Sequence, residues 1–224
     1  MKEQLNIILS NISNIAQIIL VANIILYLLN RKQLNLYIKW FDVFLVVSLV
    51  TEIVAAILFK RKIPNLHVLH IYTLVEFIVL SLFYVAILQK IIAFRTRRMY
   101  WFIALVSILI VLNSIFIQLI DTLTFNSYAK TLTQVIFIAY AVLYFFIAPI
   151  ENNPKSKLLD NINSAILFYY AASLFIFMGS NLLSKLDDYH RIFWITNAIF
   201  YLVFQLIVCY ALWQFQKTTK ILYT

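Results

Sequence analysis

Two carboxylates lie inside long apolar runs of the sequence. Glu76 falls near the middle of the stretch 67–89, and Glu52 falls within the stretch 39–59. A charge at such a depth of a bilayer costs about 2.5 kcal/mol or more, so the group is normally protonated, paired or turned toward a polar cavity. The two acidic side chains are therefore the first candidates for chemistry in this chain.

The two carboxylates are predicted to lie at similar depth. Lys60 and His67 mark the same end of two sequential helices. A rise of ~1.5 Å per residue places Glu52 about 12 Å and Glu76 about 14 Å from that end. If they face each other, both cannot ionise cheaply, so we expect one of them to hold its proton.

Most other strongly polar residues of the apolar runs share this half of the bilayer. Spacings of three and four residues place several of them on common helix faces, as in Asn197, Tyr201 and Gln205. We predict a ligand pocket anchored by Glu76, open toward one side of the membrane. The alternative is that these residues only specify packing, because amides and hydroxyls often bond between membrane helices. The candidate binding residues are Glu76, Glu52, Tyr72, Thr73, Asn197, Tyr201, Gln134 and Gln118.

Metal, cofactor and nucleophile chemistry finds less support. His67, His70 and His190 fall near one end of the apolar runs and are the candidate zinc ligands, although interfacial histidines are commonly just solvated. The His-x-x-x-His pair of zinc-dependent seven-helix hydrolases is missing, and the last run has no lysine for a retinal Schiff base. No catalytic triad, phosphate loop or nucleotide fingerprint is present. We predict no metal, no cofactor and no catalytic residue.

Composition places the chain in a membrane. It has 224 residues, of which 64% are hydrophobic, and its mean hydropathy is +0.91. Soluble domains are about half apolar. The net charge of +9 arises from Lys and Arg in short segments between apolar runs, which indicates topology signals and not contact with nucleic acid.

The apolar runs predict an all-α, single-domain bundle of seven transmembrane helices over residues 1–224. Eleven of the eighteen Lys and Arg residues fall on the side of the C-terminus, and seven, counting Lys130 as a loop residue, fall on the other side. The richer side marks the cytoplasm, so we expect the N-terminus outside and the C-terminus inside. The expected spans are 6–29, 39–59, 67–89, 99–120, 128–149, 162–184 and 192–215.

Helix breakers are scarce in these runs. Gly179 is the single glycine, and Pro64, Pro149 and Pro154 fall at the ends of spans or between them. Many secondary transporters bind substrate where helices are interrupted by glycine or proline. We therefore expect continuous helices, which favours a pocket closed on one side over a path through the protein.

Two short stretches carry a resemblance. Arg191-Ile-Phe-Trp-Ile-Thr-Asn-Ala-Ile-Phe-Tyr201 and His70-Ile-Tyr-Thr-Leu-Val-Glu-Phe77 resemble a group of small seven-helix integral membrane proteins common in Bacteroidota. The resemblance implies a seven-helix fold in a bacterial inner membrane. It brings no activity with it.

Several functions remain open from the sequence. The first is a sensor that takes a small molecule or a proton into the pocket around Glu76 and signals through a membrane protein partner. A proton- or cation-coupled transporter or channel is the second, and an intramembrane lipid-modifying enzyme using Glu76 and Glu52 as acid and base is the third. A membrane accessory protein of a CRISPR system is a further alternative. All of them imply contact with the lipid bilayer.

Overall fold

The structure is an all-helical bundle with the expected number of long apolar helices. The computed structural model describes residues 2–34, 36–91, 96–120, 125–148, 153–183 and 187–223, and all regular structure within these ranges is helical. Seven of the helices are long and apolar enough to cross a membrane. The prediction of an all-α, multi-pass membrane protein is confirmed.

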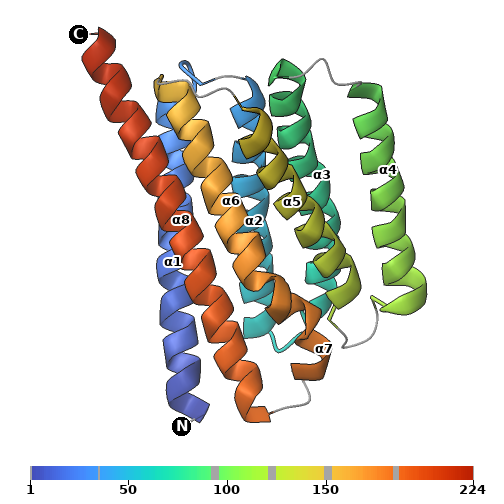
Figure 1. The fold of residues 1–224 in the computed structure, drawn as a ribbon. Helices are drawn as coiled ribbons and strands as arrows, with labels where there is room; N and C mark the ends of the chain where they lie inside the picture. The colour runs from blue at the N-terminus through green and yellow to red at the C-terminus, as the bar shows by residue number, and fades with distance from the viewer. Residues whose placement is uncertain are drawn as a thin grey trace.

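The helices alternate in direction along the chain (Figure 1). Those that begin at the end of the bundle drawn lowest in Figure 1, here called the lower end, are α1, α3, α5 and α8; the opposite end is the upper end. The chain therefore starts at the lower end and finishes at the upper end. The elements are α1 (Lys2–Asn30), α2 (Leu36–Lys60), α3 (Leu66–Ile91), α4 (Thr96–Leu112), the π-helical turn η1 (Asn113–Ile117), α5 (Ser127–Ile147), α6 (Pro154–Met178), the short α7 (Ser180–Leu183) and α8 (Asp187–Tyr223).

The sixth long helix differs from its expected span of 162–184. It begins at Pro154 because Asn153 caps it: the Asn153 side-chain oxygen accepts from the Ser156 backbone N–H at 2.8 Å. Proline suits the first helical position, where its missing N–H is not needed. The helix ends at Met178, and Gly179 separates it from α7. The expectation of one uninterrupted helix is wrong here.

The fourth helix also departs from the expected continuous span of 99–120. Regular α-helix gives way after Leu112 to a π-helical turn, in which the Gln118 backbone N–H donates to the Asn113 carbonyl at 2.8 Å. Such turns hold an extra residue and commonly mark functional positions. The polar side chains of Asn113 and Ser114 are buried at this turn.

The third helix is the centre of the bundle. In its most apolar window 61% of the residues are buried, against 22% in the corresponding windows of α1, α2, α4 and the last helix. It packs extensively along α2 and also contacts α4 and α5, while α8 packs along α1 and α6. Residues on α3 are therefore presented to several neighbours at once, which is the position that Glu76 occupies.

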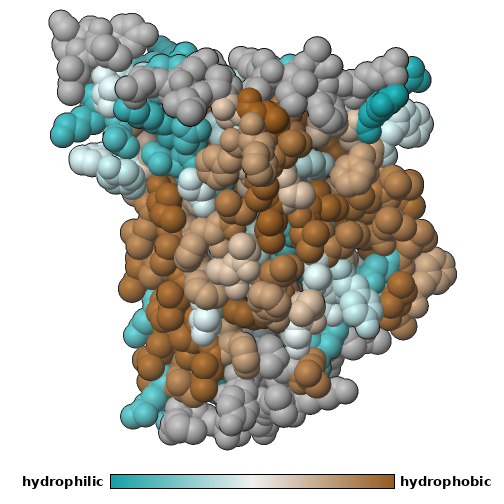
Figure 2. All heavy atoms as spheres, viewed as in Figure 1, coloured by the Kyte–Doolittle hydropathy of each residue, from teal (hydrophilic) through white to brown (hydrophobic). Residues whose placement is uncertain are grey.

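The outer surface is apolar around the middle of the bundle. Figure 2 shows a brown belt across the molecule, with most hydrophilic side chains toward the upper end and smaller hydrophilic patches nearer the lower end. Large hydrophobic side chains such as Ile18, Phe146 and Phe175 are exposed on it. A contiguous apolar surface of this extent is unfavourable in water and is what a lipid bilayer covers.

Candidate functional site: a buried ammonium among aromatic rings

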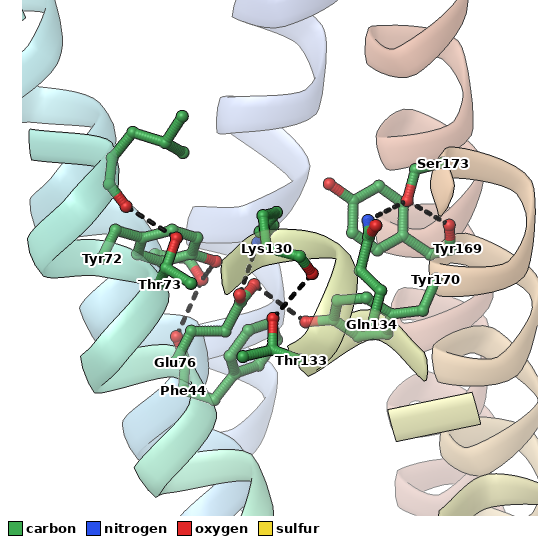
Figure 3. Close-up of polar contacts among 12 residues, drawn as sticks. Phe44, Tyr72, Thr73, Glu76, Lys130, Thr133, Gln134, Tyr169, Tyr170 and Ser173 are labelled. Atoms are coloured by element: carbon green, nitrogen blue, oxygen red, sulfur yellow. Dashed lines mark hydrogen bonds and ion pairs between the residues drawn. The ribbon is translucent and has the colours of Figure 1, made fainter. Parts of the chain in front are cut away.

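The lower half of the bundle contains a buried ion pair between α3 and α5. The Lys130 ammonium contacts Oε2 of Glu76, and the two side chains are 2% and 1% exposed. The Tyr170 hydroxyl of α6 donates to the other carboxylate oxygen, Oε1, at 2.9 Å (Figure 3). Both oxygens of the carboxylate predicted as the anchor are thus satisfied by neighbouring helices.

Aromatic rings enclose the same ammonium. The Lys130 Nζ lies 5.0 Å from the centroid of the Tyr72 ring, 5.3 Å from that of Phe177 and 5.9 Å from that of Tyr170. The negative face of an aromatic ring attracts a cation within about 6 Å, by about 2 kcal/mol or more when water is excluded. We call Glu76, Tyr72, Tyr170 and Phe177 the ammonium cage.

Lys130 falls within the expected span 128–149, and the structure corrects only its counting among the loop charges. The fifth helix starts at Ser127, so Lys130 lies in its first turn. It is followed at spacings of four, three and four by the buried residues Gln134, Phe137 and Ala141, which form one helix face. That periodicity is visible in the sequence and would have placed Lys130 on the inner face.

Neighbouring hydroxyl groups hold the cage in position. The Tyr72 hydroxyl lies 3.1 Å from Oγ of Ser48, which donates to the Phe44 carbonyl of α2 at 2.9 Å. The Thr73 hydroxyl, predicted to join the pocket, is buried and donates instead to the Leu69 carbonyl of its own helix at 2.7 Å. Tyr72 is thus fixed from a second helix, whereas the Thr73 hydroxyl is used within α3.

Gln134 continues the inner face of α5 one turn above Lys130. Its Nε2 donates to Oγ of Ser173 at 2.9 Å, and that hydroxyl donates to the Tyr169 carbonyl at 2.7 Å (Figure 3). Its Oε1 is buried and makes no hydrogen bond to any described residue. The side chain therefore ties α5 to α6 beside the cage.

The second carboxylate belongs to a different polar group. Glu52 is half-buried, and its carboxylate faces Tyr201 of α8 and Gln17 of α1. The Tyr201 hydroxyl and the Asn197 Oδ1 are buried, and neither makes a hydrogen bond to a described residue. Each carboxylate thus has its own partners, so the condition under which we expected one of them to hold its proton, that Glu52 and Glu76 face each other, is not met.

The ring of Tyr169 connects the two groups. The Tyr169 ring centroid lies 5.1 Å from that of Tyr170 and 5.7 Å from that of Tyr201. Tyr170 bonds to Glu76, and Tyr201 faces Glu52. The structure therefore brings five of the eight predicted binding residues into two adjacent groups: Glu76, Tyr72 and Gln134 in one, Glu52 and Tyr201 in the other. Asn197 lies beside the linking Tyr169, and Thr73 lies beside the first group.

Gln118 lies in a separate polar cluster at the lower end. Its Nε2 donates to Oγ of Ser127 at 2.8 Å, and its Oε1 accepts from the Tyr128 backbone N–H at 3.1 Å. These bonds join the π-helical turn after α4 to the start of α5, and Asn181 of α7 donates to Ser127 as well. We call this cluster the amide cap; its members are Asn113, Gln118, Asn126, Ser127 and Asn181.

The histidines do not form a metal site in the described part of the chain. His70 is buried, with its Nδ1 3.0 Å from Oγ of Ser114, and His67 is half-buried. His190 lies in α8, but its side chain is outside what the structure describes. Among the described side chains, no three His, Cys, Asp or Glu residues come together as ligands of a metal ion would.

The upper half is closed by aromatic packing. Phe41, Phe44, Phe83, Tyr84 and Phe204 are each at most 1% exposed, and we call them the aromatic plug. Their rings lie edge to face or tilted, as in the 5.5 Å contact of Phe41 with Phe83 and the 6.1 Å contact of Phe44 with Phe204. A hollow of about 120 Å³ beyond the plug lies between the start of α6 and the end of α8, next to Lys157 and Thr218.

The function has to be derived from this geometry. No protein-family model, no curated protein and no solved structure matches the chain.

Proposed function

We propose that this chain is an integral membrane receptor for an organic ammonium group, which it binds in the ammonium cage from the lower side. One observation carries the proposal: a buried ammonium, that of Lys130, is already held there by one carboxylate and three aromatic faces. Carboxylate plus aromatic faces is the chemistry by which proteins recognise amines and quaternary ammonium ions. Lys130 would be the resident occupant that the ligand displaces.

Displacement is favoured by the position of Lys130. An organic ammonium ion that takes the place of the Lys130 ammonium keeps Glu76 paired, so no uncompensated charge is left in the low-dielectric interior. Lys130 lies in the first turn of α5, and its flexible stem allows the released ammonium to turn toward the lower interface. The ligand and Lys130 would therefore define two states of the same site.

The amide cap would carry the signal. The first turn of α5 holds both Lys130 and Ser127, and Ser127 accepts from Gln118 at 2.8 Å and from Asn181 at 2.9 Å. A change in the Lys130 side chain therefore acts on the turn that joins α4, α5 and α7. A ligand shifts such an equilibrium only by its difference in affinity for the two states. Output would then pass to a membrane protein partner.

The orientation is proposed from charge. With Lys130 buried and paired, the sequence assigns six Lys and Arg residues to the side of the N-terminus and eleven to the side of the C-terminus. An excess of this kind marks the cytoplasmic side. The cage would then open toward the outside of a bacterial inner membrane, with the N-terminus outside and the C-terminus inside.

A cation transporter is the second candidate. The π-helical turn after α4 and the break at Gly179 are interruptions of the kind found where transporters bind substrate. The aromatic plug supports the receptor more strongly, because it closes the upper half with five buried rings. Uptake of labelled methylammonium into vesicles containing the protein would favour transport; its absence alongside binding would favour the receptor.

The proposal is tested by binding to the purified protein in lipid nanodiscs. The probes are tetramethylammonium and n-propylammonium chloride, with sodium chloride at equal ionic strength as the reference. We expect both probes to raise the thermal unfolding midpoint of the wild-type protein, and Glu76→Gln to abolish the rise because the anchoring charge is gone. Lys157→Ala, which removes an exposed lysine of α6, is the matched control and should behave as wild type.

Lys130→Ala provides the sharpest arm of the experiment. It removes the resident occupant, so n-propylammonium should bind at least about tenfold more tightly than to wild type, a difference of about 1.4 kcal/mol. The proposal is overturned if neither probe stabilises the wild-type protein. It is equally overturned if the stabilisation survives in Glu76→Gln.

A further inference from the structure

The first helix presents to the lipid an apolar seam that contains two asparagines. It lies at the edge of the bundle, where it packs along α8 and against α2 (Figure 1). Its free face carries exposed residues spaced alternately by four and three, which is the heptad spacing of a coiled-coil contact. We call them the α1 seam: Ile7, Asn11, Asn14, Ile18, Val21, Ile25 and Leu28.

Two amides of the seam lie at bilayer depth. Leu29 is exposed at the upper end of the helix, and about 20 residues of helix cross the hydrocarbon, so the apolar layer extends down to about residue 10. Asn11 and Asn14 fall inside this layer. Neither side chain hydrogen-bonds to another described residue, whereas the nearby Asn6 accepts from Arg191.

Unpartnered amides at this depth are costly. An amide moved from water to an apolar medium without a hydrogen bond loses its hydration and gains nothing in return. An asparagine side chain has two donors and one acceptor with two lone pairs, so two copies of it can satisfy each other. The seam carries no charge that would select an oppositely charged partner.

We propose that two copies of this chain associate through the α1 seam. Copies inserted in the same membrane share one orientation, so the pair is parallel, with its twofold axis along the membrane normal. Asn11 and Asn14 then meet their counterparts in the second copy. β-branched Ile18 and Ile25 favour two strands, and polar residues in such a seam fix the register.

This inference is independent of the proposed ligand. It rests on exposure and amide chemistry at the outer face of α1, away from the cage formed by α3, α5, α6 and their neighbours. The two can therefore succeed or fail separately. Cross-linking and association measurements test it without any ligand.

Cysteine cross-linking in membranes is the first test. The native Cys209 is replaced by alanine, and Ile18→Cys is introduced in the seam, where the side chain is 69% exposed. Phe146→Cys on α5, at 83% exposure, is the matched control for an equally accessible site off the seam. Mild oxidation should convert the seam variant to a disulfide-linked dimer and leave the control monomeric.

Association in lipid vesicles is the second test. The dimer fraction is followed by energy transfer between labelled copies as the protein-to-lipid ratio is lowered. Replacing Asn11 and Asn14 together by leucine should weaken association on the order of tenfold, since hydrogen bonds between membrane helices are individually modest and two asparagines are lost. Replacing both by glutamine retains the amides and should preserve most of the association.

Three outcomes would overturn the inference. One is a protein that stays monomeric at every protein-to-lipid ratio. Another is a dimer whose stability is unchanged by the double leucine replacement while the protein remains folded. The third is cross-linking of the Ile18→Cys variant only to a different membrane protein.

Discussion

The lower and upper halves of this bundle solve the same problem in opposite ways. In the lower half, polar and charged side chains are retained at bilayer depth, and Glu76 is satisfied by both Lys130 and Tyr170. In the upper half, no buried ion pair is present among the described residues; the space is filled mainly by rings such as those of Phe41 and Phe204, with neutral hydrogen bonds such as that from Tyr84 to Asn163 at 2.8 Å. The two halves thus differ in what can exchange: a cation can replace a cation, whereas nothing polar can enter among packed rings without losing its hydration.

The comparison also separates two kinds of stability. In a buried ion pair, replacing either partner destabilises the fold strongly, because the other charge is left without compensation. In aromatic packing, replacing one ring costs the stability of that ring's own contacts and of the cavity it leaves, and the other rings keep their contacts. Substitutions in the two halves should therefore differ in how their effects combine.

The largest effect is expected in the ion pair. Lys130→Met and Glu76→Gln should each lower the free energy of unfolding by about 3–5 kcal/mol, because each leaves its partner buried and unpaired. The double variant should recover a large part of that loss. Reversible unfolding in mixed detergent–lipid bicelles measures all three. If the loss in the double variant equals the sum of the single losses, the two side chains do not act as a pair.

The next effect is expected in the aromatic plug. Phe204 contacts the rings of Phe44 and Tyr169 at centroid distances of 6.1 and 5.6 Å. Phe204→Ala should lower the free energy of unfolding by about 3 kcal/mol, the low end for loss of a buried phenyl ring. The same bicelle measurement checks this. Combined with Glu76→Gln the effects should nearly add, because Phe204 reaches Glu76 only indirectly, through Tyr169 and Tyr170. Strong coupling would show that the plug and the cage act as one unit.

A smaller effect is expected in the amide cap. Gln118→Ala removes the bonds to Ser127 and to the Tyr128 backbone N–H, so stability should fall by about 1–3 kcal/mol. Hydrogen exchange should rise first in the opening turn of α5, which would place the loss at the cap. Gln4→Ala, at an exposed position of α1, is the control. Unchanged protection of that turn would contradict the role given to the cap.

The smallest effect is expected in a polar pair beside the aromatic plug. Asn23 of α1 donates to the side-chain and backbone oxygens of Gln205 in α8 at 2.8 and 3.0 Å. Asn23→Ala should cost only about 0.6 kcal/mol, the usual value of a hydrogen bond between membrane helices. A double-mutant cycle with Gln205→Ala isolates the coupling. A coupling above about 2 kcal/mol would show that this pair contributes more than packing specificity.

The gross fold followed from apolar periodicity alone. Each long run of apolar residues became a helix of spanning length, because a bilayer leaves the backbone no other way to satisfy its polar groups. The helix boundaries were harder to predict. The start of α6 at Pro154 depends on the Asn153 cap, and the end of α4 depends on a π-helical turn that buries Asn113, neither of which changes overall hydropathy.

Part of the candidate site could be predicted from the sequence. Glu76 could be singled out, because an acidic residue in the middle of an apolar run is costly and therefore informative. Tyr170 and Phe177 gave no such signal, since aromatic residues are ordinary in a membrane core. Lys130 gave one that helical spacing from Ser127 could have revealed, but it stood too close to the end of a span to be separated from the loop charges.

The sequence by itself determined that this is a membrane protein of seven apolar helices with a carboxylate at depth, because hydropathy and helical rise are local properties of the chain. Only the tertiary structure decided which groups meet that carboxylate. Lys130 and Tyr170 lie 54 and 94 residues from Glu76 along the chain, and their contact depends on how α5 and α6 pack against α3. Packing also decided that Glu52 faces Tyr201 and that aromatic rings close the upper half, because side-chain direction across helices is a property of the assembled bundle.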